Sequence, residues 1–200
     1  MSLLFETIRI ENGIIMHPGE HEKRMFTSRC ALFGLNDPIS LQQVITVPAE
    51  YTGGIVRCRI DYGREIENVK FTTYERKPLK RFRIVIKDEI EYPFKFSDRS
   101  ALESIRMENM DADEIILVKD GRITDTSFSN LIFLDGTEWI TPSSPLLKGT
   151  CRGRLIRDGK IKERDIFLKD VALFTGFKII NAMIWPEEMD LIPIDAIIRT

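Results

Sequence analysis

The chain has 200 residues, of which 43% are hydrophobic and 30% are charged, as in a globular protein of one large domain or two small ones. A net charge of −2 gives no reason to expect nucleic acid or an anionic membrane as a partner. There is no long uncharged apolar run to predict a transmembrane helix, and charged residues interrupt segment 1–13, which argues against a secretory signal.

Cysteine and histidine are scarce, and this limits the kinds of site that the chain can build. Cys30, Cys58 and Cys151 are widely spaced and form no CxxC pair, which indicates a reducing compartment and hence a cytoplasmic protein. The two histidines, His17 and His21, are too few for a typical His-based metal site or hydrolytic triad. We therefore expect no metal.

Residues 1–75 have the pattern of a small N-terminal α+β domain. In chain order we expect a strand at 2–10, a turn at 11–13 into a short strand at 14–16, helices at 20–33 and 39–46, and antiparallel strands at 55–63 and 69–77. Gly34 fits the C-terminal cap of the first helix, because glycine adopts the left-handed conformation that such caps use.

A charged, proline-containing segment at 76–80 predicts a linker, and residues 81–200 then form a C-terminal domain. Its expected elements are a strand at 81–90, a helix at 97–110 capped by Ser97 or Asp98, a strand–turn–strand–turn–strand run at 113–142, a short helix at 149–158, and a further short helix and a long strand within 161–185. The dipeptides Asp120-Gly121 and Asp135-Gly136 fit the two turns of the run.

Three residues in this second part have side chains or surroundings that suit chemistry. Lys95 lies between Phe94 and Phe96, an apolar setting that would favour a free amine, although its stem could equally cover apolar surface. Asp125 is expected on the second arm of a strand–turn–strand, and an ordinary turn aspartate is the alternative. Gly149 opens a helix whose N–H groups could hold an anion. A pyridoxal-phosphate enzyme needs these parts: an amine, an acid and a phosphate cradle.

In their order and residue patterns, the segments around these residues resemble those of the class IV (fold-type IV) aminotransferase family. The matching segments are HEKR at 21–24 (family H-x-x-R), KFSDR at 95–99 (K-x-x-N-R), DEIILV at 113–118, TDTSFSNLIF at 124–133 (T-E-x-x-x-x-N-L/I-F), PLLKGTCR at 145–152 (L-L-x-G-I-T-R) and NAM at 181–183. Aspartate replaces the family's usual residue at Asp98 and Asp125, and Cys151 stands where threonine is common. The resemblance runs from residue 4 to 195.

The resemblance implies an α+β fold of two domains, a small N-terminal α/β sandwich and a C-terminal pseudo-barrel. It also implies the cofactor, pyridoxal 5′-phosphate, with Lys95 as the Schiff-base lysine and Asp125 as the acid at the pyridine nitrogen. By the same resemblance, the remaining cofactor-binding residues hold the phosphate: Arg24, Gly149, Thr150, Cys151, Asn181 and Ala182. His21 is expected to be a packing or hydrogen-bonding residue, without a catalytic role.

Within the family, the NAM and KFSDR segments are most similar to aminodeoxychorismate lyase. That likeness implies a lyase that converts 4-amino-4-deoxychorismate, a small molecule, to 4-aminobenzoate and pyruvate for folate biosynthesis. Two alternatives remain open at this point: a branched-chain or D-amino-acid aminotransferase, and a non-catalytic member of the fold. The family also implies a homodimer.

Overall fold

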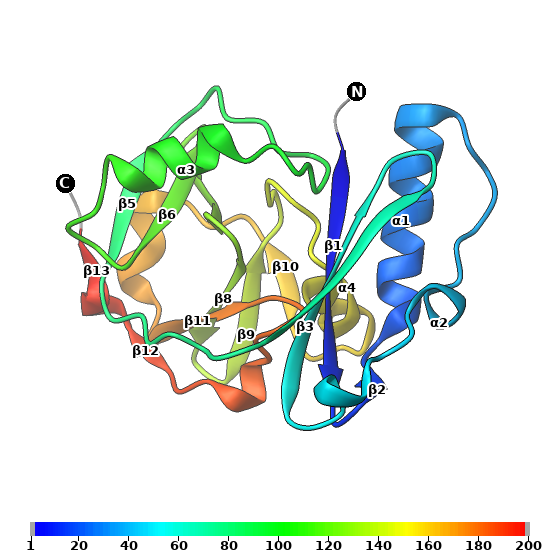
Figure 1. The fold of residues 1–200 in the computed structure, drawn as a ribbon. Coiled ribbons are helices and arrows are strands. Elements are labelled where there is room, and N and C mark those ends of the chain that lie inside the picture. Colours follow the sequence, from blue (N-terminus) through cyan, green and yellow to red (C-terminus); the bar gives the residue numbers. More distant parts are fainter. Residues whose placement is uncertain (1–2, 199–200) are drawn as a thin grey trace. The chain divides into compact units, whose positions relative to one another are not determined.

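The structure is a computed structural model that describes residues 3–198. The chain divides into two compact units (Figure 1), the first reaching to Arg76 and including Phe94–Asp98, the second made of Lys77–Pro93 and the residues from Arg99 onward. From the sequence, all of 81–200 is expected in the second domain. Residues 94–98 group with the first unit instead, because Lys95 O accepts a hydrogen bond of 2.9 Å from Phe5 N and Phe96 bridges to Leu4.

The first unit is an antiparallel sheet with two helices. Its elements are the strands β1 (Leu4–Glu11), β2 (Ile14–Ile15), β3 (Ile55–Tyr62) and β4 (Ile66–Thr73), in the order β2-β1-β3-β4, the helices α1 (Pro18–Phe33) and α2 (Leu41–Val44), and the 3-10 turn η1 (Ala49–Tyr51). The expected turn before β2 is confirmed by the positive φ of Asn12 and Gly13, and Gly34 caps α1 as expected. The second helix is shorter than the predicted 39–46.

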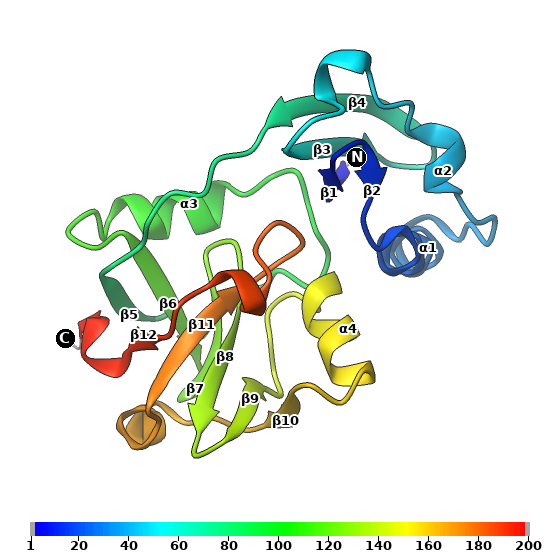
Figure 2. The same ribbon diagram turned by 90° about the horizontal axis from the view of Figure 1, so that it is seen from below.

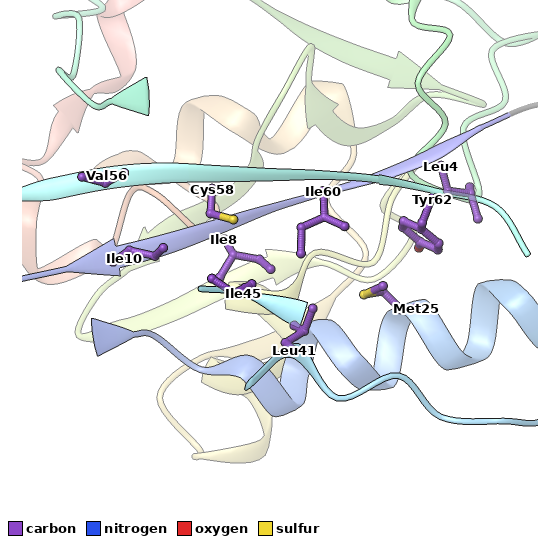
Figure 3. Close-up of a cluster of buried hydrophobic side chains, with 10 residues drawn as sticks. All are labelled: Leu4, Ile8, Ile10, Met25, Leu41, Ile45, Val56, Cys58, Ile60 and Tyr62. Atoms are coloured by element: carbon purple, nitrogen blue, oxygen red, sulfur yellow. The ribbon is translucent and has the colours of Figure 1, made fainter. Parts of the chain in front are cut away.

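The core of the first unit lies on one face of this sheet. Alternate side chains of β1 and β3 point to that face, where Met25 of α1 and Leu41 of α2 meet them (Figure 3). The buried cluster comprises Leu4, Ile8, Ile10, Met25, Leu41, Ile45, Val56, Cys58, Ile60 and Tyr62. Glu6 shares the alternation of Leu4 and Ile8, so this strand carries one carboxylate into an apolar layer.

The second unit is built on a larger mixed sheet. Its strands are β5 (Phe82–Ile86), β6 (Glu114–Lys119), β7 (Arg122–Thr126), β8 (Asn130–Asp135), β9 (Glu138–Pro142), β10 (Lys162–Arg164), β11 (Gly176–Ile180), β12 (Ile192–Pro193) and β13 (Ile197–Ile198). They run in the order β10-β9-β8-β7-β6-β5-β13, and β11 pairs with both β8 and β12. Its helices and 3-10 turns are α3 (Ser100–Met107), α4 (Thr150–Arg157), η2 (Leu168–Leu173), η3 (Pro186–Glu188) and η4 (Ile194–Ala196).

Two local expectations for the second unit were wrong. The residue before α3 is Arg99, not Ser97 or Asp98, because Ser97 N donates a hydrogen bond to Leu3 O and so belongs to the first unit. The middle strand of the run over 113–142 is interrupted at 127–129 by an additional turn, which separates β7 from β8. The predicted Asp120-Gly121 turn is confirmed by the positive φ of both residues.

None of the helices in residues 3–198 has the length and hydropathy needed to cross a bilayer. Nor does that part of the chain hold a group of three or more His, Cys, Asp or Glu side chains arranged to bind a metal ion.

Candidate active site

Asp125 lies near the end of β7, which pairs with β8, and β8 in turn pairs with β11 (Figure 2). Its side chain is buried, and both carboxylate oxygens accept hydrogen bonds, Oδ1 from Asn130 Nδ2 at 2.7 Å and Oδ2 from Leu147 N at 2.9 Å. Burial raises the pKa of Asp125 to about 6, against these hydrogen bonds and the charge of Arg152. Asp125 is thus a buried acid with a perturbed pKa, as functional sites often contain.

Asn130 joins this acid to the start of α4. Its Nδ2 also donates to Leu147 O at 2.8 Å, and a Cβ added to Gly149 would lie only 2.0 Å from its Oδ1. Glycine is therefore required at 149 for space, since its φ of −67° is open to any residue. Asn130 lies within the TDTSFSNLIF segment but was not among the predicted site residues. Its position in that motif was the available signal.

The N-terminus of α4 contains two further candidates, Thr150 and Cys151. Both are buried, and no side chain caps the helix at Gly149, so its first N–H groups remain suited to an external anion. Burial raises the pKa of the Cys151 thiol to about 11, although the nearby Arg154 opposes this. That thiol is therefore protonated near neutral pH and poorly suited to act as a nucleophile.

Asn181 and Ala182 follow β11 in a tight turn. Asn181 Oδ1 accepts hydrogen bonds from the backbone N–H groups of Met183 and Ile184, and Asn181 Nδ2 donates to Ser129 Oγ at 2.8 Å. Ala182 O accepts from Trp185 Nε1 at 3.2 Å. Asn181 therefore fixes the backbone of its own turn and links it to the turn that precedes β8.

Lys95 belongs to the first unit, in the segment beside β1. Phe94 and Phe96 pack against the core of that unit, so alternation directs Lys95 to the opposite face, where its amine lies 4.4 Å from the Phe5 ring centroid. The side chain is half-buried. The aromatic setting predicted for this lysine is present, but the ring beneath the amine is Phe5, which the sequence did not single out.

Arg24 lies on α1 in the same unit and pairs with the buried Glu6. Arg24 Nε donates to Glu6 Oε1 at 2.8 Å, and His21 Nδ1 lies 2.6 Å from Glu6 Oε2. Burial alone would raise the pKa of Glu6, but the Arg24 charge and the hydrogen bonds from both partners lower it to about 2. Burial lowers the pKa of His21, with Glu6 opposing, and the Arg24 and Lys95 charges lower it further. A neutral His21 donating to Glu6 agrees with these directions.

The candidates thus form two groups, each within one unit. In the first unit, the positive charges of Lys95 and Arg24 both lower the pKa of His21. The second unit links Asp125 and Gly149 through Asn130, and links Asn181 to the same turn through Ser129. Glu6, Ser129 and Asn130 complete these groups and were not predicted. The partners of Glu6 and Ser129 lie far away along the chain, whereas Asn130 lies within the motif that contains Asp125.

A comparison with protein-family models matches residues 97–197 to "Amino-transferase class IV". The chain belongs to the class IV aminotransferase family. An uncharacterised protein of Haemophilus influenzae is 42% identical over 182 residues, which is 90% of this chain and 97% of that protein. The predicted family is therefore confirmed, and the resemblance stated from the sequence motifs was correct.

Two solved structures extend the comparison for this class IV family member. The crystal structure of a proposed 4-amino-4-deoxychorismate lyase from Haemophilus somnus has 36% sequence identity and a TM-score of 0.84, over 92% of this chain and 97% of that one. A pyridoxal-phosphate-bound hypothetical aminotransferase from Mycobacterium tuberculosis has a TM-score of 0.71 at 16% identity, over 92% of this chain and 78% of that one. The predicted fold, α+β of fold-type IV with two sheets, is confirmed.

The residues present fit a pyridoxal-phosphate cofactor in kind and in burial. A buried acid, Asp125, lies beside the uncapped N-terminus of α4 in the second unit, and an amine and a partly buried arginine lie in the first. This fit rests on contacts inside each unit, so it holds for each group of residues separately.

Proposed function

We propose that the protein is a pyridoxal-phosphate-dependent lyase that converts 4-amino-4-deoxychorismate to 4-aminobenzoate and pyruvate. The observation that carries this proposal is the 36% identity with the proposed lyase from Haemophilus somnus over 97% of that chain, together with family membership. The buried acid at Asp125 and the uncapped start of α4 support it from this chain's own geometry.

In this proposal the second unit holds the cofactor at two ends. Asp125 accepts the hydrogen bond of the pyridine nitrogen, for which each of its oxygens keeps a second lone pair beside its present donor. The backbone N–H groups at the start of α4 bind the phosphate with the help of the helix dipole. When bound, the cofactor withdraws electrons from the substrate carbon next to the amino group.

By resemblance to the family, Lys95 would supply the amine that holds the cofactor. The same Nζ would then be the base that takes a proton from the substrate carbon that bears the amino group. Arg24 contributes a charge-assisted contact to the phosphate, and Glu6 holds its guanidinium in a fixed orientation. Asn181 and Ala182 complete the phosphate site. The side chain of Asp125 is one methylene shorter than the family's glutamate, so its carboxylate would have to sit closer to the ring nitrogen or act through a water molecule.

Two experiments test this function. First, protein purified with pyridoxal phosphate should show a visible absorbance band that borohydride removes and that Lys95→Ala lacks, whereas the exposed control Lys23→Ala keeps it. Absence of the band in the unmodified protein would favour a non-catalytic member of the fold. Second, 4-amino-4-deoxychorismate should yield equimolar 4-aminobenzoate and pyruvate. Amino transfer from branched-chain or D-amino acids to 2-oxoglutarate, without release of pyruvate, would instead identify an aminotransferase.

We also propose a homodimer as the functional form, supported by the family resemblance. Sedimentation velocity at micromolar concentration tests this directly. A species of one 23.2 kDa chain at all concentrations would contradict the proposal.

A further inference from the structure

The turn between β7 and β8 is held by hydrogen bonds to almost every polar group in it. Thr126 Oγ1 accepts from Phe128 N at 3.3 Å and from Ser129 N at 2.9 Å. Ser129 O accepts from Thr126 N at 2.8 Å and Thr126 Oγ1 at 3.2 Å. A threonine side chain that satisfies the backbone in this way makes a turn locally stable.

Three other elements of the second unit fix the same turn from outside. Ser127 N donates to Glu114 Oε1 at 3.1 Å, and Ser127 O accepts from Arg99 Nη2 at 2.7 Å. Asn181 Nδ2 donates to Ser129 Oγ at 2.8 Å. The side chains of Glu114, Asn181 and Arg99 come from the start of β6, the end of β11 and the residue before α3. The backbone of the turn is therefore determined by contacts on several sides.

Phe128 is exposed to solvent, although its neighbours in this hydrogen-bonded turn are buried. Its neighbours Ser127 and Ser129 are each 5% exposed, whereas the Phe128 side chain is 42% exposed. A ring presented on a fixed backbone needs little further ordering to contact a ligand, so it loses little conformational entropy on binding. Aromatic rings prefer to pair with other flat rings in stacked or edge-on geometry.

The position of Phe128 relates it to the proposed cofactor site. The turn joins Asp125 to Asn130, which are partners in the β7–β8 register and are hydrogen-bonded to each other. Ser129, next to Phe128, is bonded to Asn181. Phe128 is thus three residues from Asp125, the proposed partner of the pyridine nitrogen. It is also next to Ser129, which is hydrogen-bonded to Asn181 of the proposed phosphate site.

We infer that Phe128 is a specificity-determining residue that stacks on the six-membered ring of the substrate and on the flat aromatic ring of the product. This inference rests on the proposed function and deepens it, because it selects a ring-bearing substrate over a branched aliphatic one. An aliphatic side chain at this position would offer a similar apolar area but no ring face.

The test compares two carboxylates: 4-aminobenzoate, the proposed product, which has a flat ring, and 4-methylpentanoate, which is branched and aliphatic. Dissociation constants are measured calorimetrically for the unmodified protein, Phe128→Leu, Phe128→Tyr and the control Phe167→Leu. Phe167 lies elsewhere in the second unit and is similarly exposed, at 37%. Unchanged thermal melting of each variant shows that it folds, and Phe128→Met replaces Phe128→Leu if the latter does not.

The loss of a ring–ring contact should weaken 4-aminobenzoate binding by about threefold to tenfold in Phe128→Leu. The same variant should change 4-methylpentanoate binding by less than about twofold, the scale of a loss confined to apolar area. Phe128→Tyr should restore 4-aminobenzoate binding, and Phe167→Leu should alter neither ligand.

Equal losses for both ligands, or no loss for either, would overturn the inference. A change of oligomeric state in Phe128→Leu would do so too, by identifying the ring as a subunit contact. These outcomes are separable from failure of the proposed function. If the protein turns over as a lyase but Phe128→Leu binds 4-aminobenzoate as well as the unmodified protein does, only the inference about Phe128 is refuted. If Phe128→Leu selectively loses affinity for 4-aminobenzoate but the protein has no lyase activity, only the proposed function is refuted.

Discussion

Asn130 Nδ2 donates a 2.7 Å hydrogen bond to Asp125 Oδ1, and the same nitrogen donates to Leu147 O at 2.8 Å. Asp125 Oδ2 in turn accepts from Leu147 N at 2.9 Å, which closes a set of three contacts among these residues. The buried acid and the loop that leads into α4 are therefore held as one structural unit. A change at any of the three should affect both.

Gly149→Ala should destabilise the protein, whereas Gly153→Ala, four residues along the same helix, should not. A Cβ at 149 would lie 2.0 Å from Asn130 Oδ1, while a Cβ at 153 has nothing within 4 Å. The clash forces Asn130 away from Asp125 and should cost about 1–3 kcal/mol of unfolding free energy, as overpacking does. Gly153→Ala should add about 0.5–1 kcal/mol, because alanine is the better helix residue. Urea denaturation measures both, and equal stabilities would contradict the clash.

Asp125 should make the cofactor-free protein less stable as pH rises from about 4 to 6. Its folded pKa of about 6 lies above the ordinary value of 3.8, so the folded state binds this proton more tightly than the unfolded chain. The stabilisation is complete below pH 3.8 and disappears as pH rises through 6, a change of about 3 kcal/mol at 1.36 kcal/mol per pKa unit.

Asp125→Asn provides the control for this pH dependence. The variant cannot ionise at 125, so its stability relative to the unmodified protein should increase between pH 4 and 6.5. Urea midpoints at four pH values in this range give the difference. A constant difference across the range would show that Asp125 titrates normally.

Glu6 should have the opposite effect at lower pH. Its folded pKa of about 2 lies below the ordinary value of 4.5, so its stabilisation is present above pH 4.5 and lost as pH falls toward 2. At pH 7, Glu6→Gln should cost about 3–5 kcal/mol, because it leaves the Arg24 charge, 14% exposed, without its buried partner. The exposed control Glu65→Gln should change stability by less than about 0.5 kcal/mol. Similar urea midpoints for both variants would refute the buried pair.

Turns set by local chemistry were readable from the sequence. Asn12-Gly13 and Asp120-Gly121 adopt the positive φ angles that such dipeptides favour, and the amphipathic pattern located α1. The helix start at α3 was not readable. Ser97 Oγ lies 3.5 Å from Arg59 and Asp61 of β3, contacts over more than 30 residues that no local pattern encodes.

The residues of the candidate site were likewise only partly predictable from the sequence. The motif spacing was enough to identify the family and to single out Lys95, Asp125 and Gly149 as candidates. The residues that hold these in position, Glu6 and Asn130, act through side-chain contacts that become visible only in the folded chain. A motif gives the order of the functional residues along the chain. Which residues hold them in position depends on which strands become neighbours in the fold.

The bond between Asn181 and Ser129 should couple the end of β11 to the β7–β8 turn. Asn181→Ala removes this bond and the acceptor for Met183 N and Ile184 N, and should cost about 1–3 kcal/mol, as unsatisfied buried groups do.

Ser129→Ala removes only the shared bond and should cost about 0.5–1.5 kcal/mol. The double variant loses the shared hydrogen bond only once. Its cost in unfolding free energy should therefore be smaller than the sum of the two single-variant costs, by an amount similar to the cost of Ser129→Ala. Urea denaturation of the four proteins measures this coupling. Strict additivity would mean that the hydroxyl and the amide do not interact in solution, and that the Phe128 turn lacks its anchor to β11.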